Sequence, residues 1–282
     1  MVRNFFMETF RRRKHRRFRA RFGKIGPMTP TPDENRPPAP KITLVLLAYN
    51  EGDAIEATVR AATSELEKQF AAGAWELLVI DDGSRDATPG ILTALEMEIP
   101  TLRVHTHTPN AGYVEATRSA LREAHGEYVC VFDGDGQQTA ADVPRFVTKL
   151  DDGYDVVFGW KKQRFDPWPR LVLSRGLRLC ARRLLRTRLH DINAGCRGFR
   201  REKVQPLLEI RHRINFIGPE LYTRARLAGL EIGEIVVLHA PREGGESSHD
   251  FAKIPGEVAQ VVRYLLALRA ELQASKTWRK RI

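Results

Sequence analysis

Two aspartates and a glutamine follow a short apolar run and could together hold a metal ion. Asp133 and Asp135 are separated by one glycine, and Gln137 lies two residues further on. The run from Tyr128 to Phe132 has the length and composition of a buried strand. Carboxylate and carboxamide oxygens suit Mg²⁺ or Mn²⁺, which proteins often share with substrate phosphates. The pattern indicates metal-assisted chemistry on a nucleotide diphosphate, with an ordinary polar turn as the alternative.

Strand and helix signals alternate around these residues. We expect strands at 42–47, 75–80, 102–105, 128–133 and 155–159, and helices at 53–70, 86–97, 112–125 and 140–150. The run at 42–47 is apolar on both faces, as in parallel sheets, and 53–70 carries an apolar stripe. The order predicts an α/β fold with a mostly parallel twisted sheet flanked by helices. In such sheets, ligands bind beyond the carboxyl ends of the strands.

Other strand exits in this region are also polar. Tyr49 and Glu51 follow the first strand, where an aromatic ring and an acid could hold a base and its ribose. Asp82 follows the second strand, and its carboxylate could accept hydrogen bonds from a base or ribose. Asn110 precedes a helix and is a further candidate for substrate binding. The alternative for these residues is a set of turns and helix caps.

The sequence becomes strongly basic after residue 159. Residues 170–188 predict a cationic amphipathic helix, 235–239 a late strand and 257–272 a terminal helix. Residues 160–190 hold ten Lys and Arg against one Asp, a net charge of +9. This segment is either a solvated helix face or a site for phosphate groups.

Composition and charge divide the 282 residues further. Residues 1–40 carry +8 of the net +11 and end in a proline-rich linker. We expect a basic, disordered segment at 1–40, a catalytic domain at 41–250, and a helix with a basic tail at 251–282. The first segment could instead lie on an anionic membrane or be a transit peptide.

The same features indicate a compartment. No stretch of eighteen apolar residues and no secretory signal occurs, and three separated cysteines form no pair typical of zinc sites. We therefore expect a cytoplasmic protein, in part peripheral on the cytoplasmic face of a membrane.

Residues 42 to about 247 resemble the family 2 glycosyltransferases of GT-A fold, above all the dolichyl- and polyprenyl-phosphate sugar synthases. The matching motifs occur in the order of the family: Tyr49-Asn-Glu51, Val79-Ile-Asp-Asp-Gly-Ser84, Asn110-Ala-Gly112, Gly126-Glu-Tyr128, Asp133-Gly-Asp135, Asp191 with Gly195 and Arg197-Gly-Phe199, and Glu220.

The resemblance implies roles for these motifs. Asp82 and the 49–51 turn would hold the nucleotide of a nucleotide-diphosphate sugar. The three residues at 133, 135 and 137 would hold Mg²⁺ or Mn²⁺ and the diphosphate. Arg164 and Arg197 would bind phosphates of the donor or acceptor. Arg242 and Ser247 match a further phosphate-binding segment, although Ser248 replaces the lysine that is usual there.

The acceptor decides what else the reaction needs. A lipid phosphate is already ionised near neutral pH and needs positive charge, whereas a hydroxyl needs a carboxylate base. Asp191 and Glu220 are the candidates for that base. The basic segment favours a polyprenyl phosphate, so we predict a metal-dependent transferase to that acceptor. The alternatives are transfer to a hydroxyl, or a basic binding protein on a degenerate transferase fold. Nucleic acid is not expected, because no aromatic stacking platform accompanies the arginines.

Overall fold

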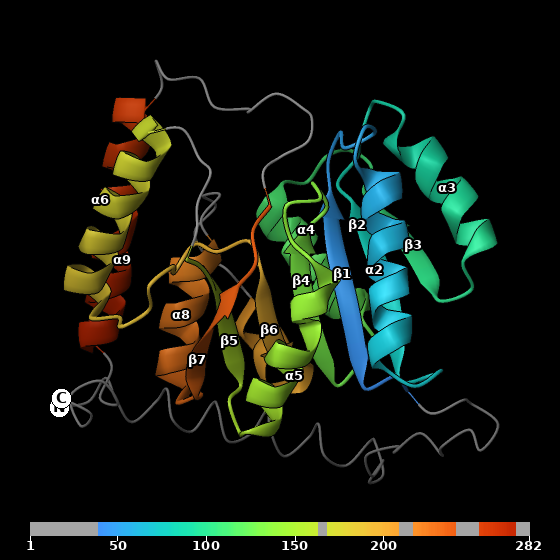
Figure 1. Ribbon diagram of the computed structural model, residues 1–282. Helices are drawn as coiled ribbons and strands as arrows, with labels where there is room; N and C mark the ends of the chain where they lie inside the picture. Colours follow the sequence, from blue (N-terminus) through green and yellow to red (C-terminus); the bar gives the residue numbers. More distant parts are fainter. Residues whose placement is uncertain (1–38, 163–167, 209–216, 241–253, 275–282) are drawn as a thin grey trace, which may run out of the picture. The chain divides into compact units, whose positions relative to one another are not determined.

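A seven-stranded sheet forms the centre of the part of the protein that the structure describes (Figure 1). This computed structural model describes residues 39–162, 168–208, 217–240 and 254–274. The strands are β1 (Ile42–Ala48), β2 (Trp75–Asp81), β3 (Leu102–Thr106), β4 (Tyr128–Asp133), β5 (Val156–Lys161), β6 (Arg197–Arg200) and β7 (Ile232–Val237). Their order is β3-β2-β1-β4-β6-β5-β7, and β6 alone among them is antiparallel to its neighbours. The predicted mostly parallel sheet is confirmed.

The register of β1 aligns the exits of three strands. Ala48 pairs with Asp81 on β2, and Leu47 pairs with Asp133 on β4. All seven residues of β1 are buried, as expected for a central strand with both faces covered. The polar residues that follow β1, β2 and β4 therefore lie at the same edge of the sheet.

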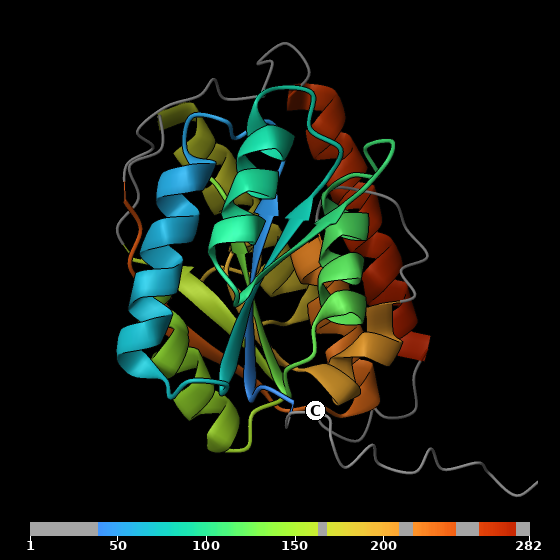
Figure 2. The same cartoon turned by 90° about the vertical axis from the view of Figure 1, so that its right-hand side faces the viewer.

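Helices cover both faces of the sheet (Figure 2). One face packs against α2 (Ile55–Gln69), α3 (Thr88–Glu98), η1 (Ala140–Asp142) and α5 (Val143–Asp151). The other packs against α4 (Tyr113–Glu123), α6 (Trp168–Leu185), α8 (Ile217–Ala228) and α9 (Ile254–Ala274), with the short α7 (Arg201–Val204) and η2 (Gln205–Leu208) after β6. Alternate residues of each strand feed the two cores, so the sheet is buried throughout its centre.

Most predicted elements occur where expected, and the differences have local causes. β6 was not predicted, because its four residues include two arginines and a glycine rather than an apolar run. α8 was not predicted either, since glycine and proline stand in its first turn. β7 begins three residues before the predicted 235 because it alternates half-buried and buried residues at the edge of the sheet.

The helix-forming terminal segment belongs to the same compact unit as the sheet. That unit begins at Ala39, and within it α9 packs against α6 and α8. The predicted boundary at residue 250 stays a prediction. The basic segment at 1–38 lies outside the described residues. Among the described helices, none combines the length and apolar character needed to span a bilayer.

A buried carboxylate links neighbouring strands at their amino-terminal ends, opposite the polar exits. Glu76 on β2 accepts hydrogen bonds from the Thr43 hydroxyl and the His125 backbone, each at 2.6 Å, and from Arg103 at 3.2 Å. Burial raises the pKa of Glu76, but the hydrogen bonds and nearby positive charge outweigh it and leave the pKa below its usual value.

This lowered pKa predicts a loss of stability in acid. Because the folded state binds the Glu76 proton more weakly than the unfolded chain, its contribution is complete above the unfolded pKa of about 4.3 and is lost as pH falls through the folded value. We expect the free energy of unfolding in urea to fall below about pH 5. Glu76→Gln should weaken that dependence, whereas Glu67→Gln, at an exposed position of α2, should leave it unchanged. Equal slopes for all three proteins would contradict the assignment.

Candidate active site

The loops after β1 and β2 are bonded to each other. The backbone NH of Asn50 donates to Ser84 Oγ at 2.9 Å, and the backbone NH of Arg85 donates to Asn50 Oδ1 at 2.8 Å. Asn50 has a left-handed backbone with φ of 54°, which asparagine tolerates well. These bonds set the position of Tyr49, whose side chain is exposed, and Glu51, which is half-buried. The structure therefore brings the predicted nucleotide residues of the two loops together.

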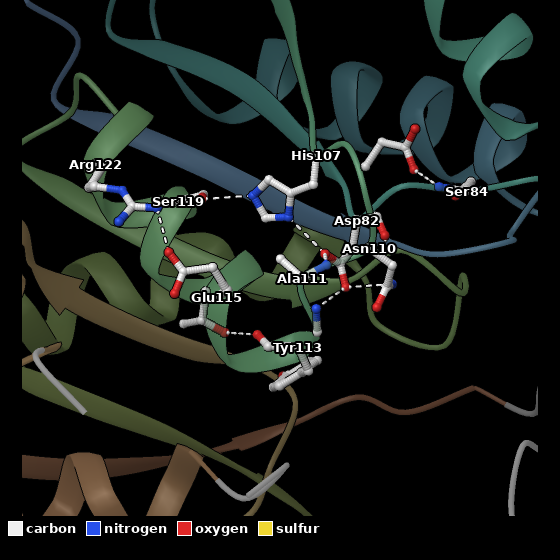
Figure 3. A network of polar contacts seen from close by, with 12 residues as sticks. Asp82, Ser84, His107, Asn110, Ala111, Tyr113, Glu115, Ser119 and Arg122 are labelled. Carbon is white, nitrogen blue, oxygen red and sulfur yellow. Dashed lines mark hydrogen bonds and ion pairs between the residues drawn. The ribbon is translucent and has the colours of Figure 1, made fainter. Parts of the chain in front are cut away.

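Asp82 organises the loop that leads into α4 (Figure 3). Its carboxylate accepts hydrogen bonds from the backbone of Ala111 and Gly112 and from the Asn110 side chain, each at 2.9 Å. His107 Nδ1 lies 2.7 Å from the same carboxylate. The Asp82 side chain is thus buried and surrounded by donors of the protein. It fixes the loop at 110–112 beside the strand exits.

The contact with His107 continues outward along α4. His107 Nε2 lies 2.8 Å from Ser119 Oγ, which accepts a hydrogen bond from Arg122 at 2.9 Å. An ionised Asp82 carboxylate only accepts hydrogen bonds, so His107 Nδ1 is the donor in that contact. Gly83 is also needed here, because a Cβ at that residue would lie 2.7 Å from the Asn110 backbone nitrogen.

A second polar network lies under Asp133. Tyr113 Oη donates to Asp133 Oδ1 at 3.2 Å, and Gln138 donates to Asp133 Oδ2 at 2.7 Å. Arg197 Nη1 donates to the Tyr113 oxygen at 3.4 Å, and its side chain is only 1% exposed. Burial, followed by the negative charge of Asp133, raises the pKa of Tyr113. Sequence reasoning missed Tyr113 and Gln138, although both stand beside recognised motifs.

Asp135 lies two residues beyond Asp133 and lines a cavity. It is half-buried on the loop after β4, and its Oδ1 accepts from the Gln137 backbone at 3.1 Å. The Gln137 side chain donates to the Ala240 carbonyl at 3.3 Å, and the Ala240 NH donates to the Gln137 carbonyl at 2.9 Å. A cavity of about 460 Å³, whose lining includes Asp135 and Asp53, opens beside this loop.

The acidic residues suit a metal ion that arrives with a substrate. No group of three histidine, cysteine, aspartate or glutamate side chains in the described ranges is placed to hold a metal by itself. Asp133, Asp135 and Gln137 nevertheless offer hard oxygen donors at one strand exit, which Mg²⁺ and Mn²⁺ prefer. Mg²⁺ in particular is commonly held by one or two carboxylates plus phosphate oxygens. The donor set therefore fits an ion whose coordination a diphosphate completes.

A cationic cavity of about 350 Å³ lies beside the exit of β5. Its charged lining residues include Lys161, Lys162, Arg175, Arg178, His190 and Asp191. Residues 191–195 connect this cavity to Asp133. Asp191 lines the cavity, and a Cβ on Gly195 would lie 1.9 Å from Asp133 Oδ2. The predicted base Asp191 therefore lies in a cavity next to the acidic strand exit.

The structure places Glu220 elsewhere. Its carboxylate accepts from Tyr264 Oη of α9 at 2.6 Å and from Arg224 Nε at 2.8 Å, and the residue is 1% exposed. Burial, followed by the hydrogen bond to Glu220, raises the pKa of Tyr264. In this arrangement Glu220 fastens α8 to α9. Arg164, Arg242 and Ser247 lie outside the described residues.

The fold and the aligned polar exits define an α/β protein of the GT-A class. Glucosyl-3-phosphoglycerate synthase from Mycobacterium tuberculosis, solved with Mn²⁺, UDP-glucose and phosphoglyceric acid, matches with a TM-score of 0.63 and 22% identity over 82% of this chain and 80% of that one. A mannosyltransferase from Pyrobaculum calidifontis, solved with GDP-Man and Mn²⁺, matches with a TM-score of 0.55 and 21% identity over 84% and 75% of the two chains. These similarities confirm the predicted fold.

The protein belongs to glycosyl transferase family 2, whose model matches residues 43–208. Undecaprenyl-phosphate 4-deoxy-4-formamido-L-arabinose transferase of Klebsiella pneumoniae is 32% identical over 222 residues, and the transferase of the same name from Salmonella choleraesuis is 29% identical over 218. Each match covers 77% of this chain and 65% of the relative. The chain thus spans slightly less than two thirds of the length of these relatives. The predicted membership of the glycosyltransferases is confirmed.

Proposed function

We propose that this protein transfers a sugar from a nucleotide diphosphate to a polyprenyl phosphate with the help of Mg²⁺ or Mn²⁺. The observation that carries the proposal is the cationic cavity next to the acidic strand exit. A donor diphosphate and an acceptor phosphate need separate sites that meet at the anomeric carbon. The two sites are joined by the short segment from Asp191 to Gly195.

The first site would bind the donor. Tyr49 and Glu51 would contact the base and ribose, and Asp82 would hold the loop at Asn110 beside them. Asp135 and Gln137 would hold the metal with the diphosphate. A bound ion would neutralise the charge that develops on the leaving diphosphate.

Asp133 and its neighbours would position the acidic loop. Asp133 accepts from Tyr113 and Gln138, and Arg197 holds the Tyr113 hydroxyl from the interior. With 1% exposure, Arg197 has no open path to a substrate phosphate, so we assign it to positioning. A substrate then meets a carboxylate whose orientation is set before binding, which reduces reorganisation during the reaction.

The cationic cavity would bind the acceptor. Lys161, Arg175 and Arg178 can attract and orient a phosphate monoester, whose ionised oxygen needs no base to attack the sugar. The names of the curated relatives, which include undecaprenyl phosphate, agree with such an acceptor. Arg164, Arg242 and Ser247 are proposed as further phosphate contacts from their sequence motifs alone.

An acceptor of this kind resides in a membrane, so we propose peripheral attachment. The exposed arginines of α6 and the basic segment at 1–40 would face anionic lipid. Each basic side chain near such a surface contributes about 1 kcal/mol of attraction.

The test supplies radiolabelled nucleotide sugars with polyprenyl phosphate in detergent and Mn²⁺, and measures lipid-linked sugar. We expect one donor to give product that disappears when EDTA is added. Turnover of a soluble hydroxyl acceptor without lipid product would instead support the hydroxyl reading, with Asp191 as the base. Donor hydrolysis and transfer that are absent with every nucleotide tested would contradict an enzymatic role.

A further inference from the structure

His190 is held rigidly in the cationic cavity by two neighbours. Its ring stacks on Trp160 with centroids 4.0 Å apart and planes inclined by 16°. Its Nδ1 lies 2.7 Å from Glu234 Oε2, while the backbone NH groups of His190 and Asp191 donate to Glu234 Oε1 at 2.8 and 3.0 Å. Glu234 therefore sets both the backbone and the ring orientation of His190.

The contact with Glu234 also decides which ring nitrogen carries a hydrogen. An ionised carboxylate only accepts hydrogen bonds, so Nδ1 must be the donor in the pair. Nε2 is then left to take up a proton or to donate one. No residue in the described ranges forms a hydrogen bond with Nε2, and the His190 side chain is 45% exposed. The reactive nitrogen is thus available to a ligand in the cavity.

We propose that His190 shares a single proton with the acceptor phosphate, an inference that rests on the proposed function. A monoanionic phosphate monoester passes its remaining proton to Nε2, and a dianionic one is matched by a proton that Nε2 takes from water. In both cases the complex contains an imidazolium and a dianion. The phosphate oxygen forms a bond to the anomeric carbon while the bond from that carbon to the nucleotide diphosphate breaks, and the diphosphate leaves with the bonding electrons. The product is a diester with one negative charge, and the imidazolium returns its proton to water.

A phosphate monoester suits this arrangement better than a hydroxyl. Its second ionisation has a pKa of about 6, and histidine changes its charge between about pH 5 and 8, so both groups titrate in the same range. The carboxylate of Glu234 stabilises the imidazolium once it forms. A second cavity, of about 680 Å³, is also lined by His190. The other charged residues that line one of the two cavities are Lys161, Lys162, Arg175, Arg178, Arg186, Arg188, Asp191, Arg226, Glu231 and Glu234.

Proton uptake on binding tests the proposal directly. Farnesyl monophosphate in detergent is titrated calorimetrically at pH 7.5 in two buffers of different ionisation heat. The wild-type protein should take up a fraction of a proton, and His190→Gln none. Loss of one charge-assisted hydrogen bond should weaken binding by His190→Gln about tenfold at pH 6.5, with a smaller difference at pH 8.5. A purely structural defect would weaken binding equally at both pH values.

His125 provides a matched control at the opposite edge of the sheet. Its Nδ1 lies 3.2 Å from Glu76, and its side chain is 46% exposed, close to the value for His190. His125→Gln should keep the proton uptake and affinity of the wild type. If proton uptake persists in His190→Gln, the proposed role of His190 is wrong, but the proposed function is not affected. If the wild type neither binds the lipid phosphate nor glycosylates it, the proposed function fails and the role of His190 fails with it.

Discussion

Asp135→Ala should reduce kcat/KM for sugar transfer by about 10³-fold, the upper end of what loss of one preorganised electrostatic contact costs. Asp135 lines the cavity of about 460 Å³, and we propose that it holds the metal against the diphosphate. Without it, the charge on the leaving group is less well neutralised. The free energy of unfolding should change by at most about 1 kcal/mol, because the side chain is only half-buried. Steady-state kinetics with saturating Mn²⁺ and urea unfolding measure the two effects.

Asp53→Ala is the matched control for this variant. Asp53 is an exposed carboxylate on the rim of the same cavity as Asp135, but it stands before α2 rather than after β4. Its removal should leave kcat/KM within about twofold of the wild-type value, since exposed charges are screened by water and salt. Donor binding and hydrolysis that are unchanged in Asp135→Ala would instead favour a non-catalytic binding protein.

Gly195→Ala should remove most activity and also destabilise the fold. The added Cβ would lie 1.9 Å from Asp133 Oδ2 and 2.7 Å from Gln138 Nε2, so the carboxylate must leave its hydrogen bonds. We expect about 1–3 kcal/mol of destabilisation from overpacking. Activity should fall about 100-fold, because a displacement of about 1 Å in a reactive group has that effect. Kinetics together with thermal unfolding separate the loss of activity from loss of folded protein.

Gly90→Ala tests whether these effects are specific to the site. Gly90 lies in α3, and a Cβ there meets no atom within 4 Å. Because alanine is the better helix former, this variant should be more stable by about 0.5–1 kcal/mol and equally active. Full activity in Gly195→Ala would show that the orientation of Asp133 does not matter for transfer.

The alternation of strand-like and helix-like apolar patterns along the sequence predicted most of the fold. β1, β2 and β4 each contain a run of apolar residues, the pattern that a buried parallel strand produces. β6 could not be found in this way. Its Arg197 is buried between β4 and β5, where only long-range pairing makes an arginine acceptable in a strand.

Sequence alone identified the acidic and aromatic residues at the strand exits, because the residue types and spacings are local properties of the chain. Only the tertiary structure separated the residues that position loops from those that line cavities. Asp82 accepts hydrogen bonds from the loop at 110–112, Asp133 accepts from Tyr113 and Gln138, and Asp135 lines a cavity. Glu220 lies in an internal ion pair, and His190 stands in the basic cavity. The hydrogen-bond partners of these residues lie as many as 44 residues away along the chain, so no local pattern contains them.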